Sequence, residues 1–110
     1  GKGAKPDSMR SEALSLIKKI PKNNYVILLD ERGEALSSID FSKKLFSTQP
    51  KDTTFIIGGA YGVDFSLFEA ADYVWSLSKL VFPHELVRLI LMEQIYRAYS
   101  IHAGHPYHHN

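Results

Sequence analysis

The sequence predicts an α/β domain built on a parallel sheet. The apolar run at residues 25–29 is continuous rather than alternating, which is typical of a strand that is covered on both faces, and two further strand-like runs are expected at residues 53–57 and 73–77. Segments with helical patterns separate these runs, and each connection is long enough to cross over between parallel strands. A long terminal helix is expected over residues 84–101. We therefore expect one domain over residues 1–110.

The first helix is expected after a lead-in, residues 1–6, that is rich in Gly, Lys and Pro. Asp7 or Ser8 is available to cap its N-terminus, and Pro21 is expected to end it. Its apolar residues fall on one stripe, as an amphipathic helix requires. They are Met9, Ala13, Leu14, Ile17 and Ile20.

The first strand covers residues 25–29, and residues 30–33 are expected to turn the chain at its carboxyl end. Ser37, with Asp40 three residues later, resembles the start of a capping box. This pattern predicts a second helix that runs to about Phe46.

A short helix, expected over residues 65–71 with Asp64 as its cap, links the second and third strands. Trp75 in the third strand is expected in the core rather than as a platform for stacking bases. A loop, residues 78–83, leads from this strand to the terminal helix. Because ligands of open parallel sheets bind beyond the carboxyl ends of the strands, three places are expected to meet at one pocket. They are residues 29–30, 58–59 and 77–78.

A glycine cluster, Gly58, Gly59 and Gly62, directly follows the second strand. It is either a tight turn that uses positive φ, or a loop whose bare backbone lets a nucleotide-like cofactor approach closely. The spacing leaves both interpretations open. It matches neither the G-x-G-x-x-G pattern nor a P-loop with its final Lys and Ser or Thr, so hydrolysis of nucleoside triphosphates is disfavoured.

The composition excludes several classes of protein. No cysteine occurs in the 110 residues, which excludes disulfides and thiolate nucleophiles. A net charge of +1 does not indicate nucleic acid, so RNA binding would need a local basic patch or a surface shared with a partner. No apolar run approaches the ~20 residues that span a bilayer, and no signal-peptide pattern is present. We expect a soluble cytoplasmic protein that does not bind membranes.

The terminal helix is apolar around nearly its whole circumference, so it must be buried on several sides. In a domain this small, a second copy is the expected cover, and we predict a homodimer. Glu93 and Arg97 have the i,i+4 spacing of a structural ion pair. Arg88, one turn after Pro83, is expected near the pocket and is a candidate for contacting phosphate.

Histidines gather at the C-terminus, where four of the five lie in the last nine residues, together with Tyr107. Their spacing matches no standard zinc site, so no metal is predicted. The segment is either a polar, frayed end of the chain, or a tail that folds over a site and supplies proton acceptors near neutral pH.

Several separate motifs, in this order along the chain, carry a resemblance to a known family. They are residues 25–30, 56–62, 75–78, 82–84, 86–88, 93–98 and 105–108. The chain resembles the RlmH-type SPOUT methyltransferases, which use S-adenosylmethionine to methylate N3 of a pseudouridine in large-subunit (23S) ribosomal RNA. The resemblance covers about the last two-thirds of a family member, and the family's opening strand–helix–strand segment is expected to be absent here.

The resemblance implies an α/β knot, in which the C-terminal segment threads through a loop to make a deep trefoil knot, a rare exception among folds. It also implies a homodimer whose terminal helices meet, with S-adenosylmethionine bound in a bent shape. With Gly58 added from the glycine cluster, nine residues are candidates for binding this cofactor. They are Leu29, Gly58, Gly59, Ser78, Lys79, Leu80, Val81, Phe82 and Pro83.

The chemistry that the resemblance implies is methyl transfer from a sulfonium, which the protein assists by aligning the pseudouridine N3 and removing its proton. The candidates for handling this proton or orienting the base are His105, Tyr107 and His108, supplied across the dimer. Arg88 is the candidate for binding RNA. The expected substrate is the assembled ribosome, whose large docking surface suits a modest net charge.

Two other functions remain open. One is a non-catalytic dimeric module that holds a nucleoside or RNA without turnover. The other is a SPOUT enzyme with a different RNA target. The intact loop at residues 78–83 and the His/Tyr tail favour an enzyme, whereas the absent opening segment favours the non-catalytic module.

Overall fold

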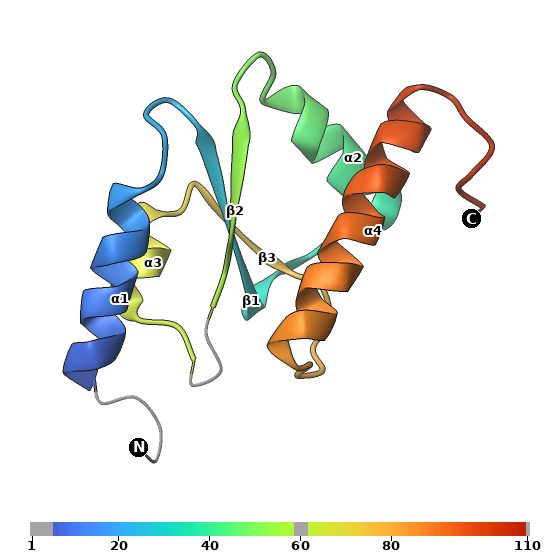
Figure 1. Ribbon diagram of the computed structural model, residues 1–110. Helices are drawn as coiled ribbons and strands as arrows, with labels where there is room; N and C mark the ends of the chain where they lie inside the picture. The colour runs from blue at the N-terminus through green and yellow to red at the C-terminus, as the bar shows by residue number, and fades with distance from the viewer. Residues whose placement is uncertain (1–5, 59–61, 110) are drawn as a thin grey trace.

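A parallel sheet lies at the centre of the computed structural model, which describes residues 6–58 and 62–109 (Figure 1). Over these residues the sheet has three strands in the order β2-β1-β3, and helices cover both of its faces. The predicted α/β class and the parallel pairing are confirmed. The elements are α1 (Pro6–Lys18), β1 (Tyr25–Ala35), α2 (Ser38–Ser47), β2 (Thr53–Ile57), α3 (Phe65–Ala70), β3 (Tyr73–Ser76) and α4 (His84–His102).

The central strand β1 is buried on both faces because its residues alternate between two separate cores. Ile27 and Leu29 belong to the core beneath α2 and α4. Val26 and Leu28 belong to the core beneath α1 and α3. This is why the strand's sequence is a continuous apolar run and not an alternating one.

The core beneath α2 and α4 is centred on Phe41, whose ring stacks on Trp75 with centroids 4.0 Å apart. Trp75 is 2% exposed, so its predicted place in the core is confirmed. Helices α2 and α4 approach closely at Ala98, which is fully buried. There the Ser42 hydroxyl donates to the Ala98 carbonyl over 2.8 Å, a bond that ties the two helices together.

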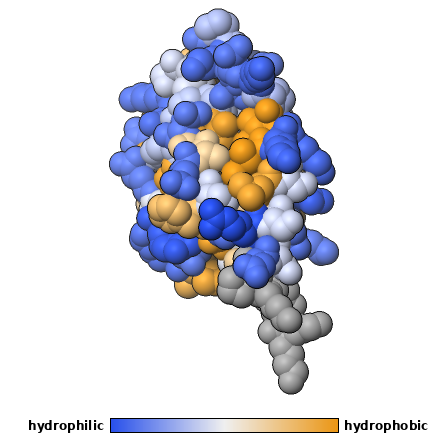
Figure 2. Space-filling view, turned by 90° about the vertical axis from the view of Figure 1, so that its left-hand side faces the viewer, coloured by the Kyte–Doolittle hydropathy of each residue, from blue (hydrophilic) through white to orange (hydrophobic). Residues whose placement is uncertain are grey.

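Helix α1 packs on α3 at the opposite face of the sheet. One prediction about it is wrong. It begins at Pro6, so Asp7 lies within the first turn and is not an N-cap, since proline suits a first helical turn. It ends at Lys18, three residues before Pro21, in agreement with the predicted stop. Apolar side chains are visible among polar ones on this face (Figure 2), where Leu14, Leu16 and Phe65 are exposed.

The predicted turn at residues 30–33 is also wrong, because β1 continues to Ala35 through an irregularity in its pairing with β3. Both Leu29 and Glu34 pair with Trp75, so the four residues between them bulge from the ladder. Gly33 makes this possible. A Cβ atom there would lie 2.5 Å from the Val74 carbonyl oxygen, so only glycine lets the two strands approach this closely.

The predicted helix caps after β1 and β2 are confirmed. The Ser37 side chain accepts a hydrogen bond from the Asp40 amide, and the Asp64 side chain accepts one from the Ser66 amide. Apart from β1, which extends six residues past its predicted end, the elements lie within about two residues of their predicted bounds, with β3 ending at Ser76 and α3 at Ala70.

Helix α4 packs one side against α2 and leaves large apolar side chains on the other. The exposed side chains follow one another at helical spacing, which makes an unpaired apolar stripe. They are Leu86, Leu89, Met92, Tyr96 and Tyr99. Among the described residues, no helix combines the length and apolar character that crossing a bilayer requires.

Candidate active site

A cavity of about 460 Å³ opens at the carboxyl edge of the sheet, a volume in the range of small-molecule sites. All three strands contribute to it, as the parallel order of the sheet predicts. The residues at the strand ends that line it are Leu29, Asp30, Ile57, Gly58, Leu77 and Ser78.

The loop after β3 forms a second wall of the cavity. Two hydrogen bonds shape this loop: the Ser76 hydroxyl donates to the Ser78 carbonyl, and the Leu80 amide donates to the Ser78 hydroxyl. Every predicted cofactor residue of the loop lines the cavity except Lys79, whose Nζ donates instead to the Glu31 carbonyl over 3.3 Å. The loop residues that line the cavity are Ser78, Leu80, Val81, Phe82 and Pro83.

Two apolar side chains of this loop are unusually open to solvent. Leu80 is 69% exposed and Val81 is 81% exposed, although both border the cavity. Apolar groups so placed gain burial when a ligand or a partner covers them. The loop therefore offers an apolar surface to whatever occupies the cavity.

In the opposite wall of the cavity, the described glycines of the cluster bring the backbone close to its neighbours. A Cβ atom on Gly58 would lie 2.5 Å from the Val63 Cγ2 atom, so any side chain here displaces Val63, which also lines the cavity. Gly62 has a φ of 111°, a conformation that glycine alone adopts readily. Gly59, the third predicted member, lies outside the described residues.

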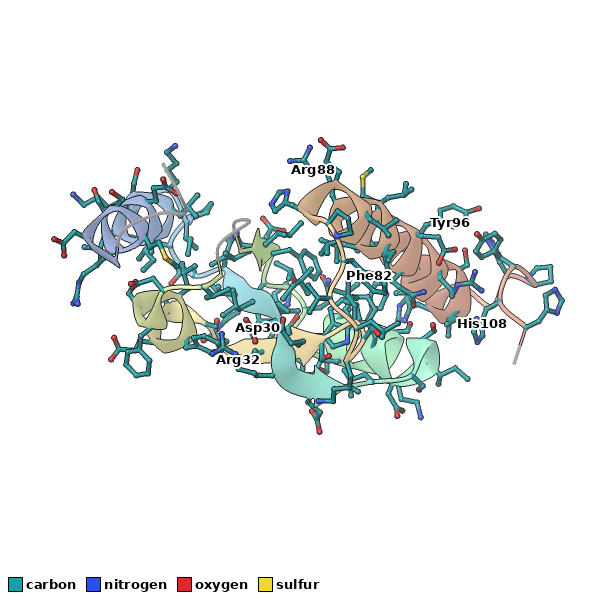
Figure 3. All side chains as sticks on the ribbon, turned by 90° about the horizontal axis from the view of Figure 1, so that it is seen from below. Asp30, Arg32, Phe82, Arg88, Tyr96 and His108 are labelled. Carbon is teal, nitrogen blue, oxygen red and sulfur yellow. The ribbon has the colours of Figure 1, made fainter. Side chains whose placement is uncertain are left out.

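A buried carboxylate, Asp30, and its partner Arg32 lie in the bulge of β1 (Figure 3). Asp30 was predicted at the pocket as part of residues 29–30, whereas Arg32 was not predicted as a site residue. Asp30 and Arg32 both line the cavity. The Arg32 Nε atom is 2.8 Å from Asp30 Oδ1, and this hydrogen bond holds the pKa of the Asp30 carboxyl below its usual value. The available signal for Arg32 is the Asp-x-Arg pattern directly after the apolar run, a pattern that also predicts a turn.

The tail folds against α4 and makes a second polar group, here called the tail cluster: Glu93, Arg97, Tyr107 and His108. The Glu93 carboxylate accepts from Arg97 over 2.9 Å and from Tyr107 Oη over 2.7 Å. These bonds lower the pKa of Glu93 and raise that of Tyr107. Arg97 also lies 3.0 Å from His108 Nδ1, and its guanidinium sits over the Tyr107 ring.

The ion pair of Glu93 and Arg97 confirms the structural role predicted from their spacing. Its contact with the tail was not predicted, because sequence spacing does not reveal which side chains a tail meets. Tyr96 adds an edge-to-face contact with Tyr107. His105 is exposed, and its backbone amide donates to the Ser100 carbonyl.

Within one copy of the chain, the cavity lies at the N-terminal end of α4 and the tail cluster lies along its C-terminal half, with His108 near the C-terminal end (Figure 3). Glu93, which binds Tyr107, lies nine residues after His84 at the cavity, which corresponds to about 14 Å along the helix axis at 1.5 Å per residue. Arg88 is exposed on the first turns of α4 and does not line the cavity. His105, Tyr107 and His108 therefore do not meet the predicted cofactor residues within a single copy.

No group of three or more His, Asp or Glu side chains suited to a metal ion occurs among residues 6–58 and 62–109. The chemistry available at the two sites consists of backbone groups, carboxylates, imidazoles, phenols and guanidinium groups.

The fold and the cavity at its strand ends agree with a family of methyltransferases. The family described as "Predicted SPOUT methyltransferase" matches residues 2–108. The chain belongs to this family.

Individual relatives are similar over most of the chain, and all carry the name ribosomal RNA large subunit methyltransferase H. The protein of Hydrogenovibrio crunogenus is 44% identical over 88% of this chain and 64% of its own length. That of Geobacter metallireducens is 47% identical over 99% of this chain and 73% of its own length. That of Polynucleobacter necessarius is 44% identical over 97% of this chain and 82% of its own length. The chain thus spans about two-thirds to four-fifths of these relatives.

Proposed function

We propose that this protein methylates N3 of a pseudouridine in large-subunit ribosomal RNA, with S-adenosylmethionine as methyl donor and the assembled cytoplasmic ribosome as substrate. The observation that carries the proposal is the cavity at the carboxyl ends of three parallel strands in a chain of the SPOUT family. The names of the relatives support the same RNA. We further propose that residues 1–110 form one SPOUT domain.

The cavity suits S-adenosylmethionine in size and in the character of its walls. Leu29, Ile57 and Phe82 offer apolar contacts to an adenine face, and the loop at residues 78–83 offers backbone groups to its polar edge. Gly58 lets Val63 keep its place in the cavity wall, because a side chain at position 58 would displace it. We place the cofactor here, held by Leu29, Gly58, Gly59, Ser78, Leu80, Val81, Phe82 and Pro83, with Lys79 supporting the loop through Glu31.

A homodimer would complete the site. The apolar stripe of α4 is exposed along the helix, and burying it against a second copy would remove five large side chains from water. If the two α4 helices pack antiparallel, the tail cluster of one copy lies near the cavity of the other, because each helix has the cavity at its N-terminal end and the cluster along its C-terminal half. We propose this arrangement, with the C-terminal segment knotted as in the family.

The bound cofactor supplies an electrophilic methyl group. His105, Tyr107 and His108 would orient the pseudouridine and accept the proton that leaves N3. Arg97 is a permanent donor, so its contact fixes His108 Nδ1 as an acceptor and puts the hydrogen of the neutral ring on Nε2. This tautomer suits a hydrogen bond to a pyrimidine carbonyl, and leaves His105 as the better acceptor for the proton. Arg88 is proposed to contact RNA phosphate.

The direct test is transfer of a labelled methyl group from S-adenosylmethionine to ribosomes that lack the modification, followed by nucleoside analysis of the RNA. We expect N3-methylpseudouridine in the large-subunit RNA. Cofactor binding without methyl transfer would instead support the non-catalytic module, and a methylated nucleoside of another kind would support a different RNA target.

The shared site has a sharper test, in which Gly58→Val and His108→Ala chains are produced separately and co-expressed. Each variant alone should lose most of its methyl transfer, since Gly58→Val has a displaced cavity wall and His108→Ala lacks the imidazole that orients the base. When the two variants are co-expressed in equal amounts, about half of all dimers contain one copy of each variant. Each of these hetero-dimers has one intact site out of two, so about a quarter of wild-type activity should return. A mixture as inactive as its components would place the cavity and the tail cluster in the same copy.

A further inference from the structure

The charged groups that line the cavity differ greatly in exposure. Among the described lining residues, those with titratable side chains are Asp30, Glu31, Arg32 and His84. The Asp30 side chain is 4% exposed, whereas that of Arg32 is 62% exposed. Glu31 is also exposed. The field of Asp30 therefore reaches the cavity mainly through protein, where charges are screened only weakly, and not through water.

Hydrogen bonding keeps Asp30 ionised and its orientation fixed. Its Oδ1 accepts from the Arg32 amide over 2.9 Å and from Arg32 Nε over 2.8 Å, and its Oδ2 accepts from Arg32 Nη2 over 3.0 Å. These bonds use three of the roughly four acceptor positions of a carboxylate. The Arg32 guanidinium is itself held over the Phe68 ring of α3, 4.7 Å from its centroid.

The two ligands that such a cavity must distinguish differ by one charge. Under the proposed function, on which this inference rests, the cofactor enters with a sulfonium and leaves as a neutral thioether after the carbon–sulfur bond breaks. S-adenosylmethionine and S-adenosylhomocysteine otherwise share the adenosine and the amino-acid arm. The apolar walls contact these shared parts equally and discriminate little between them.

We propose that Asp30 makes the cavity prefer the cationic cofactor over its neutral product, and that Arg32 limits this preference by neutralising part of the Asp30 charge. A buried anion attracts a nearby sulfonium and gains nothing from a thioether. The arrangement would help the spent cofactor to leave after each transfer. Glu31 contributes less, because water screens its exposed carboxylate.

The test compares calorimetric affinities of S-adenosylmethionine and S-adenosylhomocysteine for the full chain and three variants. Asp30→Asn should lower the ratio of the two affinities at least about fivefold, because it removes the anion and leaves Arg32 unpaired. Arg32→Gln should raise the ratio, because it leaves the Asp30 charge uncompensated. The two changes thus act in opposite directions, which a general loss of folding cannot imitate.

Glu34→Gln is the matched control. Glu34 lies on the same strand and accepts a hydrogen bond from Tyr73, but it does not line the cavity, so its removal should leave the ratio unchanged. If Asp30→Asn unfolds, Arg32→Gln tests the proposal alone, since its side chain is mostly exposed.

Two results would overturn the inference. Wild-type ratios in both Asp30→Asn and Arg32→Gln would refute it and leave the proposed function intact, since both ligands would still bind. A folded wild-type chain that binds neither ligand would refute the proposed cofactor and the inference together.

Discussion

The two ends of α4 offer opposite environments. At the N-terminal end, the cavity has mostly backbone and apolar walls, and Asp30 and Arg32 are already bonded to each other. Along the C-terminal half, the tail cluster is a network of polar side chains, none of which lines the cavity. Holding a nucleoside requires space and apolar contact, whereas handling a proton requires titratable groups at fixed positions. The cavity mainly meets the first requirement, because its fixed carboxylate is already bonded to Arg32, and the tail cluster meets the second.

The largest effect should come from filling the cavity wall. Gly58→Val puts side-chain atoms where Val63 now lies, so we expect the affinity for S-adenosylmethionine to fall at least about 100-fold by calorimetry. The tail should not respond, and nuclear magnetic resonance contacts between Tyr96 and Tyr107 should persist.

Gly104→Ala is the control for this change, because its φ of 75° strains an added side chain in the tail, where no atom lies within 4 Å, and leaves the cavity wall as it is. It changes a glycine in the tail and should leave cofactor affinity as in the wild type. Undiminished affinity in Gly58→Val would mean that the cofactor does not use this wall.

A smaller effect, about tenfold on methyl transfer, is expected from Glu93→Gln, which weakens the bonds that hold Arg97 and Tyr107. Cofactor affinity should not change, since Glu93 is remote from the cavity. A tenfold loss of cofactor affinity in this variant would contradict the separation of the two ends.

The same carboxylate predicts how the tail responds to acid. Arg97, and then Tyr107, hold the pKa of folded Glu93 below its ordinary value of 4.5. Its contribution to tail stability is therefore complete above pH 4.5 and is lost as the pH falls through the lowered value. Tyr107 resonances should report release of the ring below that pH in the wild type, and Glu93→Gln should remove this transition.

The smallest effect should come from Arg88, which is exposed near the start of α4 and belongs to neither end's network. For Arg88→Ala we expect about a threefold rise in KM for ribosomes at physiological salt and no change in kcat, because one exposed phosphate contact is weak and screened. The rise should shrink as salt increases. A fall in kcat would instead place Arg88 at the reacting base.

Sequence alone predicted the regular elements well, because buried parallel strands and capped helices leave local signals. The caps Ser37 and Asp64 and the core position of Trp75 are examples. The bulge after Leu29 was missed, because charged residues with a glycine also signal a turn. The bulge differs from a turn in the close approach of the β3 backbone to Gly33, and this contact joins segments about 40 residues apart in the sequence.

The site was predicted in part for the same reason. Strand ends meet wherever a parallel sheet is recognised, so Leu29, Gly58 and Ser78 could be placed at one cavity. The partners of Tyr107 and His108 depend on how the tail folds back over α4, which no local pattern encodes. The distance between the tail and the cavity likewise follows from the length of α4 and not from residue type.

The length of α4 also sets the distance and the direction from the cavity to the tail. One inserted residue near its middle would swing everything beyond it by about 100° and lengthen it by about 1.5 Å. The tail would then point to a new side of the helix, although every side chain of the cavity and the cluster is kept. Seven inserted residues would nearly restore the direction but displace the tail by about 10 Å. The number of residues between the cavity and the tail thus determines where the tail side chains lie, in addition to the identity of those side chains.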